Sequence, residues 1–113
     1  MREQRGRAMT PIEHEVLQRF RTLLVERVSL RSLVLFGSRA RGDADPDSDV
    51  DVLVVVDRLD EDTQKHVSYS AWEAGFPHGL VLVPVTVSRD EWENGPERHS
   101  LLAQAVAREG IPV

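Results

Sequence analysis

The sequence predicts a small α/β (α+β) protein with a sheet of three or more strands and helices packed on it. Three segments dominated by Leu and Val have the length of strands and cover residues 30–36, 50–56 and 80–87. Capped segments with helical spacing alternate with them. Because all of this fits within 113 residues, a single domain with one core is expected.

Residues 10–13 have the pattern of a helix N-terminus. Thr10 can act as the N-cap, Pro11 occupies the first turn, and Glu13 follows three residues after the N-cap. Apolar residues then recur at helical spacing, which predicts a face packed on the sheet, the alternative being a partner-binding face. They are Ile12, Val16, Phe20, Leu23, Leu24 and Val28. Residues 1–9, which precede the N-cap Thr10, are expected to form a mobile tail.

The middle of the chain predicts two strands in different environments and a polar helix between them. Residues 30–36 end in the apolar run Leu33-Val34-Leu35-Phe36, which suits a central strand. Pro84 cannot donate to a ladder, so the third strand is expected at an edge or bulged. Residues 59–75 predict a helix with Asp60 as its cap and Gly75 just beyond its end. Its apolar face is thin, so it is expected to lie across a sheet edge or to meet another chain.

Two helices are predicted in the last quarter of the chain. Ser88 and Glu91 form a capping-box pattern that starts a short helix through Trp92. A final helix is predicted over residues 97–109, ended by Gly110. Its expected apolar face consists of Leu101, Leu102, Ala105 and Val106.

Composition excludes several classes of protein. With 41% hydrophobic and 29% charged residues, the chain has the composition of an ordinary globular domain. It contains no cysteine, which excludes disulfides, thiolate metal sites and thiol nucleophiles. No apolar run approaches the ~18 residues of a membrane span, and no apolar signal core is present, so a cytoplasmic location is expected. A net charge of −5 argues against general nucleic-acid binding.

The segment FGSRARGDADPDSDVDV, residues 36–52, carries residues suited to chemistry. Gly37 and Ser38 form a small-residue turn directly after a predicted strand. Asp49 and Asp51 stand two apart at the start of the next strand, so alternation places both carboxylates on one face, with Cα atoms about 6.6 Å apart.

These residue types match the needs of a metal-loaded phosphate chain. Mg²⁺ prefers carboxylate, phosphate and water oxygens as ligands, and Asp49 and Asp51 can supply the carboxylates. The turn offers backbone N–H groups and the Ser38 hydroxyl to phosphate oxygens, and Arg39 and Arg41 can add positive charge. The sequence therefore predicts a nucleotide site in which the turn holds phosphates and the adjacent strand holds metal.

Two other motifs fail on inspection. Gly37 and Gly42 have the spacing of a P-loop, but Asp43 and Ala44 stand where that motif needs Lys and Ser or Thr. The loop acids alternate like calcium ligands, yet no register supplies the required Gly at the sixth and Glu at the twelfth position. The three acids at positions 43, 45 and 47 are accordingly interpreted as a solvated loop.

Gly37-Ser38, ten residues and then Asp49-Val50-Asp51 resemble the signature of the polymerase-beta-type nucleotidyltransferase superfamily. The fuller string GSRARGDADPDSDVDVLVV and the tail LLAQAVAREGIPV resemble its minimal nucleotidyltransferase (MNT) branch. The resemblance implies a palm-like fold with a small mixed sheet. It also implies that Gly37 and Ser38 bind the triphosphate, while Asp49 and Asp51 are catalytic and bind Mg²⁺.

The resemblance also implies a partner. MNT proteins are typically the antitoxins of pairs with HEPN proteins, which are all-helical RNases, and some transfer AMP from ATP to a tyrosine of the toxin. An antitoxin that modifies a HEPN partner is therefore expected, in a homo- or hetero-oligomer that the sequence does not define.

One feature departs from the superfamily. Its members usually carry a third catalytic carboxylate on the third strand, but residues 80–87 contain only Leu, Val, Pro and Thr. Asp57, Asp90 or Glu91 can replace it only if the fold brings one of them close. Three hypotheses follow: an active nucleotidyltransferase, a degenerate binding domain that masks a toxin, and a nucleotide or metal sensor without a toxin.

Overall fold

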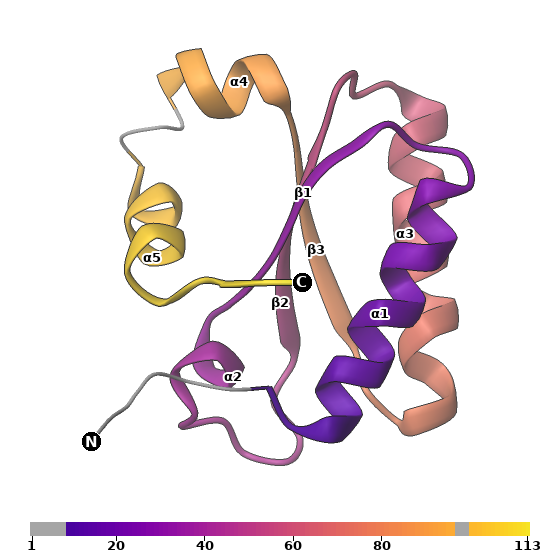
Figure 1. Ribbon diagram of the computed structural model, residues 1–113, viewed down its shortest axis with the longest axis vertical. Coiled ribbons are helices and arrows are strands. Elements are labelled where there is room, and N and C mark those ends of the chain that lie inside the picture. Colours follow the sequence, from indigo (N-terminus) through magenta and orange to yellow (C-terminus); the bar gives the residue numbers. More distant parts are fainter. Residues whose placement is uncertain (1–8, 97–99) are drawn as a thin grey trace.

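A four-stranded sheet with helices on both faces forms the protein, as seen in a computed structural model that describes residues 9–96 and 100–113 (Figure 1). The elements in chain order are α1 (Pro11–Val25), β1 (Leu30–Phe36), α2 (Ser38–Arg41), β2 (Val50–Val56), α3 (Glu61–Gly75), the 3₁₀ helix η2 (Phe76–His78), β3 (Leu82–Ser88), α4 (Arg89–Asn94), α5 (Leu101–Glu109) and β4 (Ile111–Pro112).

The sheet is mixed and has the order β3-β2-β1-β4. β1 pairs antiparallel with β2 and with β4, whereas β2 and β3 run parallel. The predictions of a central first strand and of an edge position for the strand that carries Pro84 are confirmed. The N–H of Val50 donates to the Val81 carbonyl at 2.9 Å, and alternate backbone groups of β3 point toward β2 and away from it. At position 84 the N–H would point away from β2, toward the free edge of the sheet. The missing N–H of Pro84 therefore costs no hydrogen bond between strands.

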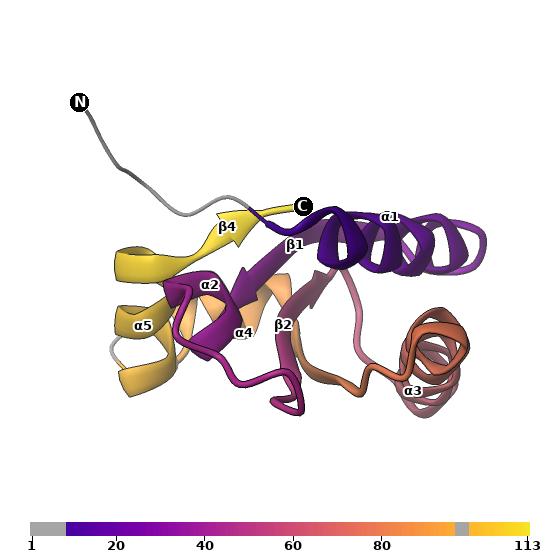
Figure 2. The same ribbon diagram turned by 90° about the horizontal axis from the view of Figure 1, so that it is seen from below.

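Two helix layers cover the two faces of the sheet (Figure 2). α1 and α3 lie side by side on one face, where the larger core includes Phe20, Leu24 and Val67. α4 and α5 lie on the other face, where Trp92 and Val106 pack against a smaller core. The chain therefore buries apolar side chains on both sides of β2.

Alternation along β2 divides its residues between these two cores. The even-numbered valines at positions 50–56 belong to the larger core. Leu53 and Val55 belong to the smaller core. Asp51 lies on the same face as Leu53, by the period of two along a strand. The acid therefore points to the side of α4 and α5, not into the α1–α3 layer.

The start of α1 is formed as predicted, with a complete capping box between Thr10 and Glu13. The predicted apolar stripe is buried except for Ile12, which is 47% exposed; that part of the prediction is wrong. Leu17, which the stripe omitted, is fully buried instead, because the face in contact with the sheet is wider than a single row. Residues 1–8 of the predicted tail lie outside the described residues, and Met9 packs against the larger core.

The helix predicted over residues 59–75 is α3, and Asp60 caps it by accepting from the Thr63 N–H at 2.8 Å. Gly75 is the last residue of the helix and not the residue beyond it, so that prediction is wrong by position. The chain continues through η2 and turns at Gly79, which has φ +68°. Glycine is required at position 75 because a Cβ there would meet the carbonyl oxygen of Leu80.

The outer surface of α3 and the start of η2 carry three exposed aromatic side chains. Tyr69, Trp72 and Phe76 are 59%, 57% and 66% exposed. Their rings form a ladder, with centroids 6.1 Å apart between the first two and 5.1 Å apart between the last two. α3 packs against α1 and against the edge strand β3. The expectation that this helix meets another chain stays a prediction.

The C-terminal part differs from the prediction in three places. α4 begins with the predicted capping box of Ser88 and Glu91. Residues 97–99 of the predicted last helix lie outside the described residues, and α5 is described from Leu101, which is 83% exposed and not part of an apolar face. Gly110 is extended (φ −64°, ψ 139°) and not left-handed, because the chain continues directly into β4, a strand that the sequence did not predict.

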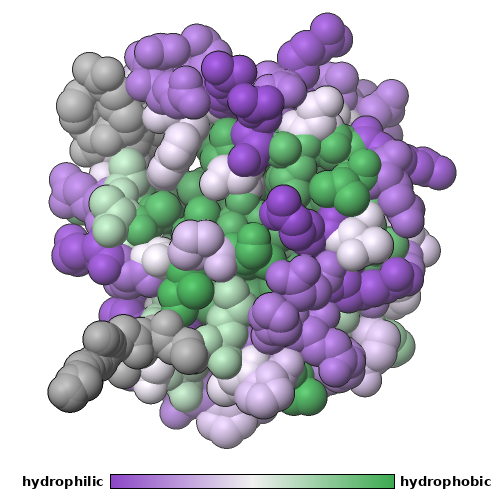
Figure 3. Space-filling view, in the orientation of Figure 1, coloured by the Kyte–Doolittle hydropathy of each residue, from purple (hydrophilic) through white to green (hydrophobic). Residues whose placement is uncertain are grey.

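Hydrophobic residues gather in the centre of the face shown in Figure 3, and hydrophilic residues form its rim.

None of the helices in the described part of the chain has the length and apolarity needed to cross a membrane.

Candidate functional site

The turn after β1 is built on the backbone freedom of Gly37. This residue has φ +80° and ψ −160°, a region that is essentially restricted to glycine. It places Ser38 at the first position of α2. The N–H groups of Ser38 and Arg39 have no acceptor among the described residues, so the turn presents two free backbone donors and a hydroxyl.

Asp49 and Asp51 stand at the start of β2, beside this turn. Asp51 pairs with Phe36 across the sheet, directly before Gly37. Its carboxylate is so close to the Gly37 α-carbon that a Cβ on residue 37 would collide with it. The structure therefore brings together the predicted turn and the predicted acid pair, which lie more than ten residues apart in the sequence.

Neither Asp49 nor Asp51 has a hydrogen-bond or ion-pair partner within the described part of the chain. Burial and then the negative charge of Asp49 raise the pKa of Asp51 above its ordinary value, and Arg41 lowers it by a smaller amount. An acid pair in this condition is stabilised by a cation.

Apolar side chains occupy the strand next to the acid pair. β3 runs parallel to β2, with Val83 opposite Asp51, and Val81 precedes it on the same face. Val81 is 61% and Val83 36% exposed. No group of three acidic, histidine or cysteine residues that could hold a metal occurs among the described residues.

The acids proposed as replacements lie at the opposite end of the sheet. Asp57 follows the end of β2, and Asp90 and Glu91 belong to α4, which follows the end of β3. The seven residues of β2 span about 20 Å. Because β2 and β3 are parallel, all three acids are separated by this length from Asp49 and Asp51.

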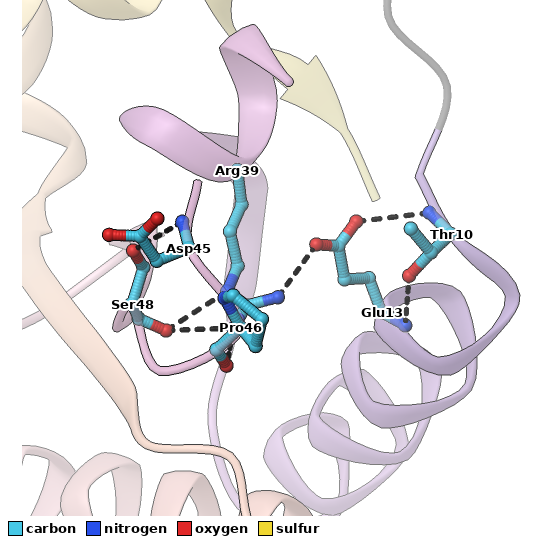
Figure 4. Close-up of polar contacts among 6 residues, drawn as sticks. All are labelled: Thr10, Glu13, Arg39, Asp45, Pro46 and Ser48. Carbon is cyan, nitrogen blue, oxygen red and sulfur yellow. Dashed lines mark hydrogen bonds and ion pairs between the residues drawn. The ribbon is translucent and has the colours of Figure 1, made fainter. Parts of the chain in front are cut away.

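The guanidinium of Arg39 donates hydrogen bonds to other residues of the protein (Figure 4). Its Nη1 donates to Glu13 at 3.0 Å, its Nε and Nη2 donate to the Ser48 carbonyl at 3.0 and 2.9 Å, and its Nη2 also donates to the Pro46 carbonyl at 3.0 Å. The Arg39 and Glu13 side chains are only 10% and 6% exposed. This residue therefore ties α1 and α2 to the loop that leads into Asp49.

The structure adds Glu109 to the site, a residue that no sequence pattern indicated. Glu109, at the end of α5, accepts from the Gly37 N–H at 2.8 Å and from Nη1 of Arg41 at 3.1 Å. Arg41 also donates to Asp43 at 3.2 Å. The only sequence signal near Glu109 was the resemblance of the tail LLAQAVAREGIPV to MNT proteins, which concerned a helix and not a site.

A comparison of sequence profiles decides the family, because the profile described as "Nucleotidyltransferase domain" matches residues 17–100. The chain belongs to the nucleotidyltransferase domain family. No curated protein matches the chain. The resemblance to nucleotidyltransferases drawn from the turn and the acid pair is thereby confirmed.

Solved structures share the fold of this nucleotidyltransferase domain. A chain from a toxin–antitoxin complex with AMP-PNP has a TM-score of 0.58 and 21% identity, over 88% of this chain and 70% of that one. A chain from a mutant of the MntA-HpeT toxin–antitoxin has a TM-score of 0.58 and 19% identity, with the same coverage. A chain from a Shewanella oneidensis complex of tri-AMPylated HEPN toxin and MNT antitoxin has a TM-score of 0.53 and 18% identity, over 89% and 70% of the two chains. At these identities the likeness concerns the fold.

Proposed function

We propose that this nucleotidyltransferase domain is the antitoxin of a HEPN/MNT pair and transfers a nucleoside monophosphate, AMP from ATP, to its partner protein in a Mg²⁺-dependent reaction. The observation that carries the proposal is the unpartnered acid pair beside the Gly37 turn. The similar chains come from toxin–antitoxin complexes, one with AMP-PNP and one with an AMPylated HEPN toxin, which supports the choice of nucleotide and partner.

The acid pair fits a hard divalent cation. Asp49 and Asp51 supply oxygen ligands on one face of β2, and their mutual repulsion is relieved when positive charge is present. One or two carboxylates together with phosphate oxygens are the usual protein-side ligands of Mg²⁺. When bound, the ion would neutralise charge on the triphosphate and on the departing pyrophosphate.

The Gly37 turn holds the phosphate chain in this proposal. The free N–H groups of Ser38 and Arg39 and the Ser38 hydroxyl are the donors. Arg41, which is half exposed, adds positive charge next to them. We assign Arg39 an indirect role, because its guanidinium already has four donor contacts within the protein.

The reaction joins an acceptor hydroxyl oxygen of the partner to the α-phosphorus of the nucleotide. The bond between that phosphorus and the bridging oxygen breaks, and pyrophosphate leaves. The hydroxyl proton must pass to a base. Because Val83 on β3 and Val81 just before this strand lie next to the acid pair, the described part of this chain offers no third carboxylate there, and water or the partner would take the proton.

The apolar neighbours of the acid pair also support a second candidate function. A domain that binds nucleotide and metal but lacks a base would neutralise the toxin by masking it. The observation in favour of this alternative is that Asp57, Asp90 and Glu91 all lie at the far end of the sheet, so none of them replaces the third carboxylate.

Mass spectrometry separates the two functions. A HEPN-type helical protein is co-expressed with the chain and incubated with ATP and Mg²⁺, and the intact mass of that candidate partner is measured. Transfer predicts a mass increase of one or more nucleoside monophosphates, which disappears when both Asp49→Ala and Asp51→Ala are introduced. A stable stoichiometric complex with no mass increase supports masking and rejects transfer.

A matched control guards against a folding artefact. Asp57→Ala removes an acid from the opposite end of β2, where Asp57 pairs with Arg31 at 3.4 Å near the surface. This variant should support the same mass increase as the unaltered chain. If it loses transfer as completely as the double variant, the role assigned to the acid pair is wrong.

A further inference from the structure

The carboxylate of Glu109 bridges two donors of the proposed nucleotide site. Its Oε2 accepts from the Gly37 N–H at 2.8 Å and from Nη1 of Arg41 at 3.1 Å. The Glu109 side chain is only 12% exposed, although Arg41 is 48% exposed. The contact joins residues 72 positions apart, so the end of the chain reaches the turn that follows the first strand.

The backbone around Glu109 is fixed to the strand that leads into this turn. Gly110 donates back to Val106 at 2.9 Å and ends α5. Ile111 pairs with Leu35 on β1, and the Val113 N–H donates to the Leu33 carbonyl at 2.9 Å. The backbone that carries the Glu109 carboxylate is therefore hydrogen-bonded to β1. Gly37 directly follows Phe36, the last residue of β1.

The hydrogen bond to Glu109 stabilises the unusual backbone conformation of Gly37. Its φ of +80° with ψ −160° is sparsely populated even in folded chains. A hydrogen bond to a carboxylate is stronger than one to a neutral acceptor, and it fixes the direction of the peptide plane before Gly37. The same peptide sets where Ser38 begins α2 and how closely the turn approaches Asp51.

The position of the carboxylate argues against its being a temporary occupant of the phosphate site. The N–H groups of Ser38 and Arg39 remain without acceptors among the described residues. Phosphate oxygens can bind there while Glu109 stays on the Gly37 N–H. Glu109 also orients Arg41 toward the same side; among the described residues, the other acceptor of that guanidinium is Asp43.

We infer that Glu109 is a positioning residue of the nucleotide site: its carboxylate holds the Gly37 turn and the Arg41 guanidinium in the arrangement that receives the triphosphate. This inference rests on the proposed function, because it assigns the turn and Arg41 to phosphate binding. It adds the C-terminal strand and helix to the machinery, through a contact made entirely within this chain.

The first test measures the contact itself, without nucleotide. Amide hydrogen exchange at Gly37 is compared in the unaltered chain, Glu109→Ala and Glu109→Gln. Loss of the acceptor should raise the exchange rate of Gly37 about tenfold or more in the alanine variant. The glutamine variant, whose amide oxygen can still accept, should restore most of the protection. Unchanged exchange in the alanine variant would overturn the inference.

The second test measures the dissociation constant of Mg²⁺·AMP-PNP by calorimetry. Glu109→Ala should weaken binding about tenfold, and Glu109→Gln should remain within about threefold of the unaltered chain. Glu73→Ala, which removes a carboxylate paired with Arg19 at 3.2 Å in the opposite helix layer, should bind normally. Unchanged or tighter binding by the alanine variant would overturn the inference, since tighter binding means that the carboxylate competes with phosphate.

Failure of this inference can be told apart from failure of the proposed function. If binding depends on Asp49 and Asp51 but not on Glu109, only the positioning role is wrong. If the unaltered chain binds no Mg²⁺·AMP-PNP, the proposed function and the nucleotide role of Glu109 are both wrong. Should Glu109→Ala fail to fold, Glu109→Asp carries both tests with the same expected direction, because its shorter side chain withdraws the carboxylate from both donors.

Discussion

The carboxylate of Asp51 lies directly against the α-carbon of Gly37. The two residues come from adjacent antiparallel strands, where Asp51 pairs with Phe36. Only a residue without a side chain permits this approach, and only glycine readily adopts the backbone angles found there. The proposed phosphate turn and the proposed metal site are therefore one packed unit.

Gly37→Ala should disrupt this unit. The substitution forces an unfavourable backbone region and places a Cβ on the Asp51 carboxylate, so we expect a loss of about 3 kcal/mol or more in the free energy of unfolding. Urea denaturation measures this loss. The control is Gly79→Ala, which has φ +68° but no atom within 4 Å of the added Cβ, and it should cost only about 1–2 kcal/mol. Equal losses would show that the contact with Asp51 is unimportant.

The pH dependence of stability should reveal the raised pKa of Asp51. Burial, followed by the Asp49 charge, raises the pKa of Asp51 above 3.8, so protonation is favoured in the folded state. Without metal, this residue destabilises the fold increasingly as pH rises from 3.8 through the raised pKa, and by a constant amount above it.

Asp51→Asn removes that penalty. In the presence of a chelator, its melting temperature relative to the unaltered chain should increase as pH rises through this interval and then level off. Thermal melts across acidic to neutral pH measure the difference. A difference that is the same at every pH would contradict the raised pKa.

The buried ion pair of Arg39 and Glu13 should be a major source of stability for the loop before Asp49. Arg39→Ala leaves the Glu13 carboxylate buried without its charged partner, so we expect a loss of about 3–5 kcal/mol in the free energy of unfolding. Arg19→Ala breaks the more exposed pair with Glu73 and should cost no more than about 1 kcal/mol. Denaturation of the two variants gives the comparison, and similar losses would contradict a structural role for Arg39.

Val83 is the position at which a third carboxylate can be added, because it faces Asp51 across the β2–β3 ladder and is 36% exposed. Val83→Asp should lower the melting temperature when metal is absent, through repulsion between three acids, and Mg²⁺ should restore it. Thermal melts with and without Mg²⁺ measure this response. Val83→Asn is the control of equal size. If both variants respond equally to Mg²⁺, the added acid is not at the metal site.

Much of the fold could be predicted because local signals and burial agree. The capping boxes of α1 and α4 specify their starts through contacts within four residues. Pro84 placed β3 at an edge because its missing N–H is incompatible with a paired ladder. β4 could not be predicted, since two residues carry no periodicity and Ile111 becomes a strand only through its pairing with Leu35.

The candidate site was predicted in part for the same reason. The proximity of Asp49 and Asp51 follows from strand alternation, and the approach of the turn to Asp51 follows from the pairing of β1 with β2. Arg39 was predicted to add positive charge to the phosphate site, and the sequence does not show that Glu13 comes within 3.0 Å of it. Glu109 was missed because its contact with Gly37 spans 72 residues and depends on β4.

Calorimetric titration with Mg²⁺·ATP tests the central claim most directly, by comparing the unaltered chain with Asp49→Asn and Asp51→Asn. We predict that the unaltered chain binds, and that each variant loses Mg²⁺-dependent binding while its circular dichroism spectrum and melting behaviour show a folded domain. Unchanged Mg²⁺·ATP affinity in both folded variants would contradict the assignment of the acid pair and the Gly37 turn as a nucleotide site.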